Sequence, residues 1–231
     1  MIVAVAFVPG PPVLVPEVAV GAAGELDDVR AACALALEAV SAAERVVVLG
    51  AADPGGRWPG DATGSLRGFG VDVRAGGPDD PVLPAPLTVA AWLLDRAGHQ
   101  GAREYRAVAD VMTPQECARL GTELAAEPRP TALVVVGEGS ARLSAKAPGA
   151  LDERAGAFEA AVADALGTAD RGALAGLDAG LAAALMVSGR APWQVAAAAW
   201  TEPQPPVGRL LAHTQPYGVG YLVATWTPAE R

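Results

Sequence analysis

Histidine, cysteine and aromatic residues are scarce in this chain. It has two histidines and two cysteines among 231 residues, and aromatic residues make up 5% of it. Cys33 and Cys117 lie in helical apolar patterns without a Cys-x-x-Cys spacing, so we interpret both as reduced core thiols rather than as metal or redox groups. A site that needs three or more imidazoles cannot be built from this chain alone.

Basic side chains and long apolar runs are also in short supply. The 17 lysines and arginines against 26 acidic residues give a net charge of -9 and a pI near 4.7, which argues against nucleic acid or an anionic membrane surface as the main partner. Pro9, Pro11 and Pro12 end the first apolar run far short of the ~20 residues of a membrane span. We therefore expect a cytoplasmic protein with no nucleic acid and no membrane as partner.

Hydrophobic residues are plentiful, at 52%, so the chain can bury a full core and we expect one α/β domain over 1–231. Continuous apolar runs predict buried strands at 2–8, 45–50 and 131–137, and helical patterns occupy 24–43, 87–98 and 113–126. Thr113 and Glu116 form a capping-box signature at the start of the last of these helices. Strand, helix, strand in this order predicts a mostly parallel central sheet flanked by helices.

The remaining segments complete this expectation. Residues 51–68 have the composition of a long loop, and a short strand-like segment follows at 70–75. Residues 151–200 predict several short helices with breaks near Gly167, Gly176 and 189–192. Residues 208–213 and 218–226 predict a closing pair of antiparallel strands.

Three loops follow the three strongest strands, at 9–12, 50–54 and 137–142. Because the carboxyl ends of parallel strands converge on one crevice, these loops are where a ligand is expected. The motifs are Val8-Pro9-Gly10-Pro11-Pro12, Gly50-Ala51-Ala52 and Gly137-Glu138-Gly139-Ser140-Ala141-Arg142, in that order, with Pro216-Tyr217-Gly218-Val219-Gly220-Tyr221 near the end. This arrangement resembles the catalytic B subunit of class III extradiol ring-cleavage dioxygenases along nearly the whole chain.

The resemblance implies an Fe(II) site, with an iron-binding histidine from each of the first two loops and an acid/base histidine from the third. Those positions read Gly10, Ala52 (or Ala51, one position earlier) and Ala141. None of these side chains binds a metal or moves a proton, and iron chemistry of this kind needs two imidazoles, a carboxylate and a further base. We therefore expect no metal, no cofactor and no catalytic residue, in a degenerate relative of the family.

Other interpretations of these residues stay open. His99 at a helix end suits contact with carbonyls or solvent, whereas His213 suits either the core or the crevice. Ser140 before His213 has the chain order of an α/β-hydrolase but lacks the Gly-x-Ser-x-Gly elbow. The glycines at 137 and 139 lack the third glycine of a dinucleotide loop. Glu17, Asp53 and Glu138 suit either an oxygen-only site for Mg²⁺ or Ca²⁺, or acids that cap turns or lie in solvent.

A small basic and polar group also lies beside the expected crevice. Ser140, Arg142 and Lys146 suit a carboxylate or phosphate ligand, or else a loop held by surface ion pairs. Trp58, Trp193 and Tyr217 suit either an aromatic pocket or the core. The sequence thus predicts a crevice for a small anionic or aromatic molecule, with an enzyme of rearranged metal ligands or an assembly protein, such as a homodimer, as alternatives. The candidate crevice residues are Gly10, Pro11, Ala52, Asp53, Glu138, Ser140, Arg142, Lys146 and His213.

Overall fold

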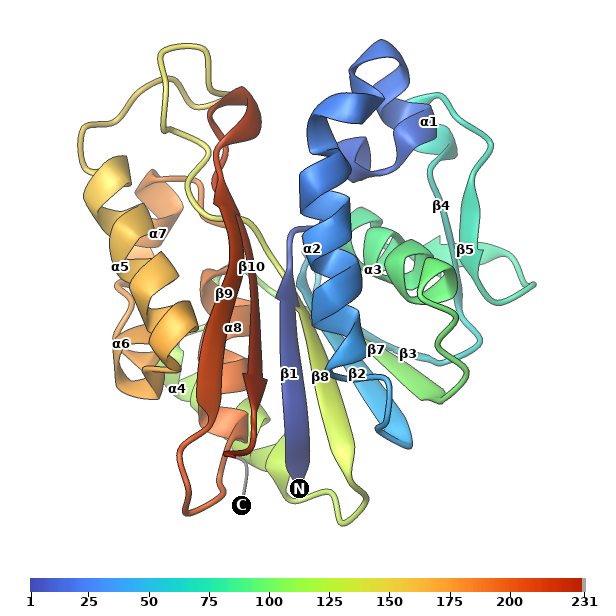
Figure 1. Cartoon of the computed structure of the whole chain (residues 1–231), viewed down its shortest axis with the longest axis vertical. Coiled ribbons are helices and arrows are strands. Elements are labelled where there is room, and N and C mark those ends of the chain that lie inside the picture. The colour runs from blue at the N-terminus through green and yellow to red at the C-terminus, as the bar shows by residue number, and fades with distance from the viewer. Residues whose placement is uncertain (230–231) are drawn as a thin grey trace.

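A mixed seven-stranded sheet forms the centre of the protein in the computed structural model, which describes residues 1–229 (Figure 1). The strand order is β3-β7-β2-β8-β1-β10-β9. Four neighbours, β7, β2, β8 and β1, are parallel, whereas β3 and β10 pair antiparallel to the strands beside them and β9 pairs antiparallel to β10. The strands of this sheet are β1 (Ile2–Val8), β2 (Arg45–Ala51), β3 (Gly56–Pro59), β7 (Ala102–Val108), β8 (Thr131–Val136), β9 (Val207–Thr214) and β10 (Tyr221–Thr227).

The central strands are the valine-rich runs that the sequence analysis placed in the core. Every residue of β2 and β8 is buried, because helices cover both of their faces. The edge strand β9 is mostly exposed and carries polar residues. The predicted α/β class, with a sheet flanked by helices and closing antiparallel strands, is confirmed. The sheet is mixed rather than mostly parallel, because β3, β10 and β9 all pair antiparallel to their neighbours.

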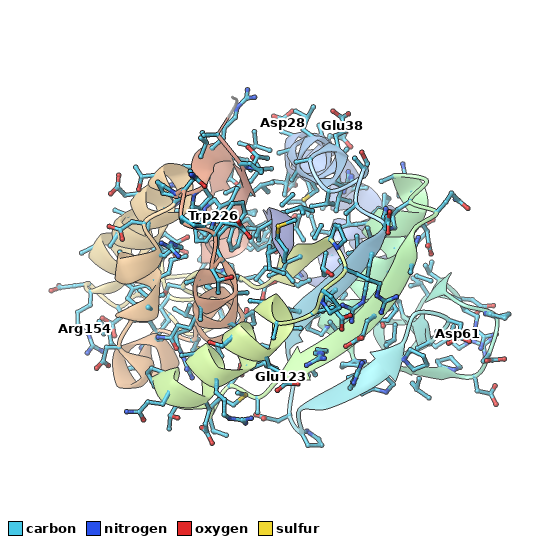
Figure 2. The ribbon with its side chains drawn as sticks, turned by 90° about the horizontal axis from the view of Figure 1, so that it is seen from below. Asp28, Glu38, Asp61, Glu123, Arg154 and Trp226 are labelled. Carbon is cyan, nitrogen blue, oxygen red and sulfur yellow. The ribbon has the colours of Figure 1, made fainter. Side chains whose placement is uncertain are left out.

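Helices lie on both faces of the sheet. Two of them, α2 and α3, pack over Ala4, Ala6, Val46 and Val48, whereas α4, α5 and α8 pack over the alternate residues of the same strands. Figure 2 shows this separation, with Asp28 and Glu38 of α2 on one side of the sheet and Glu123 of α4 on the other. The helices are α1 (Pro16–Ala19), α2 (Asp27–Glu38), α3 (Ala85–Arg96), α4 (Pro114–Ala125), α5 (Ala155–Thr168), α6 (Arg171–Ala175), α7 (Ala179–Ala184) and α8 (Arg190–Ala199). Short 3₁₀ turns are η1 (Pro12–Leu14), η2 (Val20–Leu26), η3 (Arg67–Phe69) and η4 (Pro216–Gly218).

The prediction of one long loop over 51–68 is wrong. That segment contains the edge strand β3 and the strand β4 (Thr63–Ser65), which pairs with β5 (Arg74–Gly76) and β6 (Pro81–Leu83) in a second, three-stranded sheet. These strands are only three or four residues long and rich in glycine, so they carry no apolar alternation that would reveal them.

Helix boundaries differ from the predicted ones at particular residues. Residues 24–26 belong to a 3₁₀ turn, and α2 begins only at Asp27. Gly167 does not break α5, which continues through it to Thr168. The capping box is confirmed, since the Thr113 hydroxyl accepts from the Glu116 N–H and the Glu116 carboxylate accepts from the Thr113 N–H. Within residues 1–229, none of the helices has the length and apolarity to cross a membrane.

Candidate functional site

The carboxyl ends of four parallel strands meet at one edge of the sheet. Val8 of β1 and Gly50 of β2 both pair with Val136 of β8, and Ala51 pairs with Val108 of β7. The loops that leave these strands therefore start at the same level, as the sequence analysis expected for three of them. The fourth loop, after β7, brings Asp110 to the same edge.

Glu138 connects the loop after β1 to the turn before α8. Its Oε1 accepts from the main-chain N–H of Gly10 at 2.6 Å, and its Oε2 accepts from the Ser188 hydroxyl at 2.5 Å. The Glu138 N–H donates to the Ser188 Oγ at 2.8 Å, and the Glu138 carbonyl accepts from the Gly189 N–H at 2.9 Å. Both carboxylate oxygens accept hydrogen bonds from the protein. Glu138 therefore links the loop after β8 to the loop after β1 and to the turn before α8.

Gly10 has no room for a side chain. A Cβ atom built there would lie 2.3 Å from Cγ1 of Val136 and 3.4 Å from Pro86 of α3. Real Cβ atoms do not approach a carbon so closely, so the space beside Gly10 is filled by the core. The next residue, Pro11, is half-buried, and its carbonyl accepts from the Leu14 N–H in the η1 turn.

The loop after β2 begins alongside β7. The Ala52 N–H donates to the Val108 carbonyl at 3.1 Å, which continues the pairing of β2 with β7. Asp53 is exposed and lies close enough to Asp110 to act on its charge. Burial, and then the negative charge of Asp53, raise the pKa of Asp110, while Arg190 lowers it. The negative charge of Asp53 thus acts on Asp110 at this end of the crevice.

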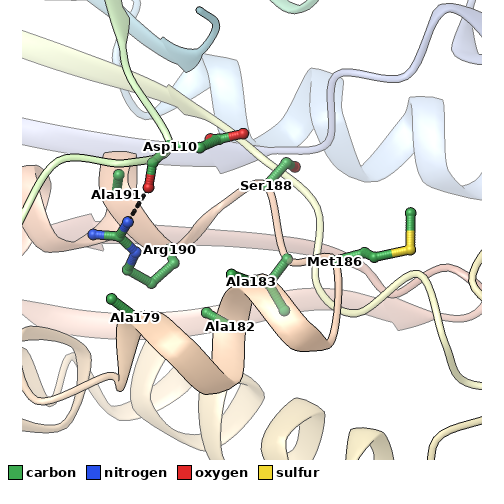
Figure 3. A pocket seen from close by; sticks show the side chains of 9 residues that line it. Asp110, Ala179, Ala182, Ala183, Met186, Ser188, Arg190 and Ala191 are labelled. Atoms are coloured by element: carbon green, nitrogen blue, oxygen red, sulfur yellow. Dashed lines mark hydrogen bonds between the residues drawn. The ribbon is translucent and has the colours of Figure 1, made fainter.

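A pocket of about 360 Å³ opens between these loops and α7 (Figure 3). Figure 3 shows Asp110 and Ser188 on one side and Ala179, Ala182 and Ala183 of α7 on the other. Met186, Val187, Arg190 and Ala191 complete the lining. Its polar side-chain groups are few, and its walls are mainly methyl groups and a thioether, which suits a small ligand with an apolar body.

Arg190 lines this pocket but is already engaged. Its guanidinium donates to the Met112 carbonyl at 2.6 Å, to Gln194 Oε1 at 3.1 Å and to the Asp110 carbonyl. The residue is only 4% exposed. Arg190 therefore anchors the β7–α4 loop, while the Asp110 carboxylate and a remaining lone pair of Ser188 face the pocket as hydrogen-bond acceptors.

Ser140 and Arg142 hold their own loop in place. Ser140 is fully buried; its hydroxyl donates to the Leu185 carbonyl at 2.9 Å and accepts from the Arg142 N–H at 3.1 Å. The Arg142 guanidinium donates to the Ala184 carbonyl at 3.0 Å and lies 3.7 Å from Asp152. Lys146 is exposed on the same loop. This geometry favours a loop clamped to α7 over a ready anion site.

His213 lies on β9 beside a buried acid that the sequence analysis did not single out. Its Nε2 is 3.6 Å from Oε1 of Glu159, a residue of α5 that is 1% exposed. Glu159 Oε2 accepts from the Ser140 N–H at 2.9 Å, and Oε1 has no hydrogen-bond partner among residues 1–229. Burial raises the pKa of Glu159 to about 7 against the lowering effect of that hydrogen bond, and burial lowers the pKa of His213.

Iron does not fit the residues at this edge. Within the described chain, no group of three histidine, cysteine, aspartate or glutamate side chains converges as metal ligands would. At the position of the first expected histidine, the Gly10 turn is closed by Val136, and Glu138 uses both oxygens on protein donors. His213 with Asp53 or Glu138, the alternative set of metal ligands, does not form such a group in the described chain either.

The sequence analysis missed Asp110, Ser188 and Glu159. Asp110 follows β7, and its place at the end of a fourth parallel strand was a usable signal. Ser188 lies in a turn between two short helices and Glu159 in an alanine-rich helix. Neither position follows a strand, and only the packing of α5 and α8 brings these residues to the crevice loops.

No family model matches the chain, and no curated protein matches it in sequence. Among solved structures, the chain is similar to the uncharacterized protein JW3007 from Escherichia coli K12, with a TM-score of 0.59 and 16% sequence identity. The match covers 97% of this chain and 99% of that one. At this identity the likeness concerns the fold alone.

Proposed function

We propose that this protein is a degenerate relative of class III extradiol dioxygenases that does not cleave aromatic rings and instead binds a small molecule at the carboxyl edge of its sheet. The pocket named here is the one lined by Asp110, Ser188 and α7. The motif order Val-Pro-Gly-Pro-Pro and Gly-Glu-Gly-Ser-Ala-Arg supports the family, and the sheet with its closing antiparallel strands is compatible with it.

One observation carries the loss of iron chemistry. The place of a side chain at Gly10 is taken by Val136, 2.3 Å from where a Cβ would lie. The turn has therefore been rebuilt around glycine, with its N–H satisfied by Glu138, rather than merely losing a ligand from an open site. An imidazole at this position would need Val136 to move, at the cost of overpacking the core.

The chemistry of the pocket favours a ligand that donates hydrogen bonds. The Asp110 carboxylate and the Ser188 oxygen are acceptors, Asp53 adds negative charge, and the guanidinium of Arg190 is occupied by carbonyl groups and Gln194. A carboxylate or phosphate ligand would meet like charge there. We therefore favour a single-ring compound with a hydroxyl or ammonium group, a size that suits a pocket of about 360 Å³.

Thermal unfolding with three probes tests this function. Catechol and benzylamine share a ring and a donor group, whereas benzoate has the same ring with an anionic acceptor. Stabilisation by catechol or benzylamine that is weakened in Asp110→Asn and kept in Asp164→Asn, an exposed acid of α5, supports the proposal. Stabilisation by benzoate alone, or by none of the three, overturns it.

A second candidate is a partner in assembly, with the homodimer as its simplest form. The exposed edge strand β9, which includes Val207 and Leu210 at 52% and 37% exposure, favours this candidate. Light scattering tests it directly. If the protein is a monomer at all concentrations and binds the ligands described above, the result rejects assembly and supports the binding function.

A further inference from the structure

Four arginines line one pocket at the opposite end of the sheet from the crevice. Arg45 is the first residue of β2, Arg103 is the second residue of β7, and Arg129 lies just before β8. Because these strands are parallel, their amino ends bring the three arginines to the same edge of the sheet. Arg57 comes from the antiparallel edge strand β3. The pocket has a volume of about 500 Å³ and is also lined by Trp58, Pro59, Gly60, Ala102 and Glu104. Figure 2 views the molecule from this end.

One carboxylate serves three of the guanidinium groups at this edge. Glu104 accepts from Arg45 at 2.6 Å, from Arg57 at 2.8 Å and from Arg106 at 2.6 Å. Burial alone would raise the pKa of Glu104, but hydrogen bonds from Arg57, Arg106 and Arg45 lower it to about 2. Glu104 therefore stays ionised at neutral pH, yet it supplies one negative charge to three positive ones.

The surrounding acids do not balance this excess at the pocket itself. Arg103 pairs with Asp95 at 2.5 Å, Arg106 lies 3.5 Å from Glu123, and Glu127 lies 3.8 Å from Arg45 and 3.4 Å from Arg129. Five arginines are thus paired with four carboxylates in this region. The pocket itself is lined by four of the arginines and by one of the carboxylates, Glu104. The side chains that line this pocket therefore carry a net positive charge, although the net charge of the chain is -9.

Two of the arginines have solvent-exposed side chains that a ligand can reach, although each is paired with an acid. The Arg57 side chain is 66% exposed, and within residues 1–229 its ion-pair partner is the shared Glu104. Arg129 is 60% exposed and makes a 3.4 Å contact with Glu127. Behind them Arg45, 7% exposed in its side chain, is held in a fixed orientation by Glu104. Guanidinium groups of this kind present paired donors that match the oxygens of phosphate.

We propose that this pocket, which we call the arginine pocket, binds a small polyanion of the phosphate type between Arg57 and Arg129, with Arg45 at its back. Trp58 forms part of the wall and its ring packs against Gly56, where a Cβ would lie 2.6 Å from the indole. The site is independent of the crevice, because it lies at the other edge of the sheet and shares no lining residue with the Asp110 pocket.

Isothermal titration with inorganic phosphate and pyrophosphate tests the proposal. We expect one site per chain, tighter for pyrophosphate, with affinity reduced about tenfold or more in each of Arg57→Gln and Arg129→Gln because a charge-assisted hydrogen bond is lost. Arg129→Gln changes an exposed side chain and should leave the unfolding temperature of the ligand-free protein nearly unchanged, whereas Arg57→Gln also removes a hydrogen bond from the buried Glu104 and should lower it. Weaker binding by Arg129→Gln therefore reports the ligand contact itself. Arg209→Gln, an exposed arginine on the opposite edge strand β9, is the matched control and should bind as the unchanged protein does.

The outcomes separate this site from nonspecific charge effects and from the crevice. Equal weakening in Arg209→Gln, or no binding at millimolar pyrophosphate in low salt, overturns the proposal, because only general electrostatics or a closed ion-pair network would then remain. Response to catechol or benzylamine should be the same in Arg57→Gln as in the unchanged protein. A failure of the arginine pocket therefore leaves the crevice proposal intact, and the reverse also holds.

Discussion

The main-chain N–H of Gly10 lies 2.6 Å from Oε1 of Glu138, although the two residues are 128 positions apart in the sequence. This hydrogen bond joins the loop after β1 to the loop after β8, and the second oxygen of the same carboxylate joins both to Ser188. At the turn where the resemblance predicts a metal ligand, the structure has this hydrogen bond between two loops instead.

Gly10→Ala should destabilise the protein. The added methyl group would meet Val136 Cγ1 at 2.3 Å, and overpacking of this kind costs about 1–3 kcal/mol. Gly68→Ala is the matched control, because nothing lies within 4 Å of a Cβ there. Denaturant unfolding measures both. Equal effects of the two changes, or a Gly10→Ala protein as stable as the unchanged one, would contradict the packed turn.

A double-mutant cycle tests whether Val136 is the residue that excludes a side chain at position 10. If Val136 is what fills the space, the cost of Gly10→Ala should shrink when Val136 is replaced by alanine, giving a coupling energy of about 0.5–3 kcal/mol. The measurement is the unfolding free energy of the four proteins. Additive effects would show that some other contact, such as Pro86 at 3.4 Å, limits the site.

Glu138→Gln should weaken the junction of the three loops. One of the two acceptor oxygens becomes an NH₂ group, so either the Gly10 N–H or the Ser188 hydroxyl loses its acceptor, and the other donor keeps only a neutral one, at a cost of about 1–3 kcal/mol. Glu17→Gln, an exposed acid of α1, serves as control. Faster amide hydrogen exchange at Gly10 in the Glu138 variant, and not in the Glu17 variant, would localise the effect to this junction.

The sequence predicts the scaffold of this crevice better than its lining. Long valine-rich runs allow only buried strands, so β1, β2 and β8 and the loops after them were identified correctly. Ser140 followed such a strand and was a natural candidate, yet its hydroxyl turns inward to Leu185. Side-chain direction in a loop depends on what packs beneath it, here α5 and α7, and no local pattern encodes that.

Glu159 should make the stability of the protein depend on pH. Its pKa is raised from 4.5 to about 7 in the folded protein, so between these values the folded state binds a proton that the unfolded state has released. The unfolding free energy therefore falls as pH rises through this window, by about 3 kcal/mol at most. His213 acts in the opposite sense, because burial lowers its pKa and the unfolded state binds more protons below pH 6.5.

Comparison with Glu159→Gln isolates the glutamate from the histidine. The glutamine variant keeps an acceptor for the Ser140 N–H but cannot titrate, so the difference in unfolding free energy between the two proteins should change steadily between pH 4.5 and about pH 7 and level off above that. The amplitude is expected on the order of a few kcal/mol. Parallel pH profiles for the two proteins would mean that Glu159 has an ordinary pKa.

Ala183→Leu should block the crevice pocket without unfolding the chain. Ala183 is exposed and lines the pocket from α7, so a larger side chain extends into ligand space rather than into the core. Ala184→Leu, one residue along the same helix and also exposed, lies outside the pocket lining. Both variants should unfold within about 0.5 kcal/mol of the unchanged protein. Only Ala183→Leu should lose stabilisation by catechol or benzylamine; loss in both would point to another binding place.

The iron content of protein loaded with Fe(II) under anaerobic conditions and then gel-filtered tests the central claim most directly, when it is measured together with catechol turnover after oxygen is admitted. The closed turn at Gly10 predicts iron far below one ion per chain and no ring-opened product. One firmly held iron per chain, with a ring-opened product formed at each turnover, would contradict the account.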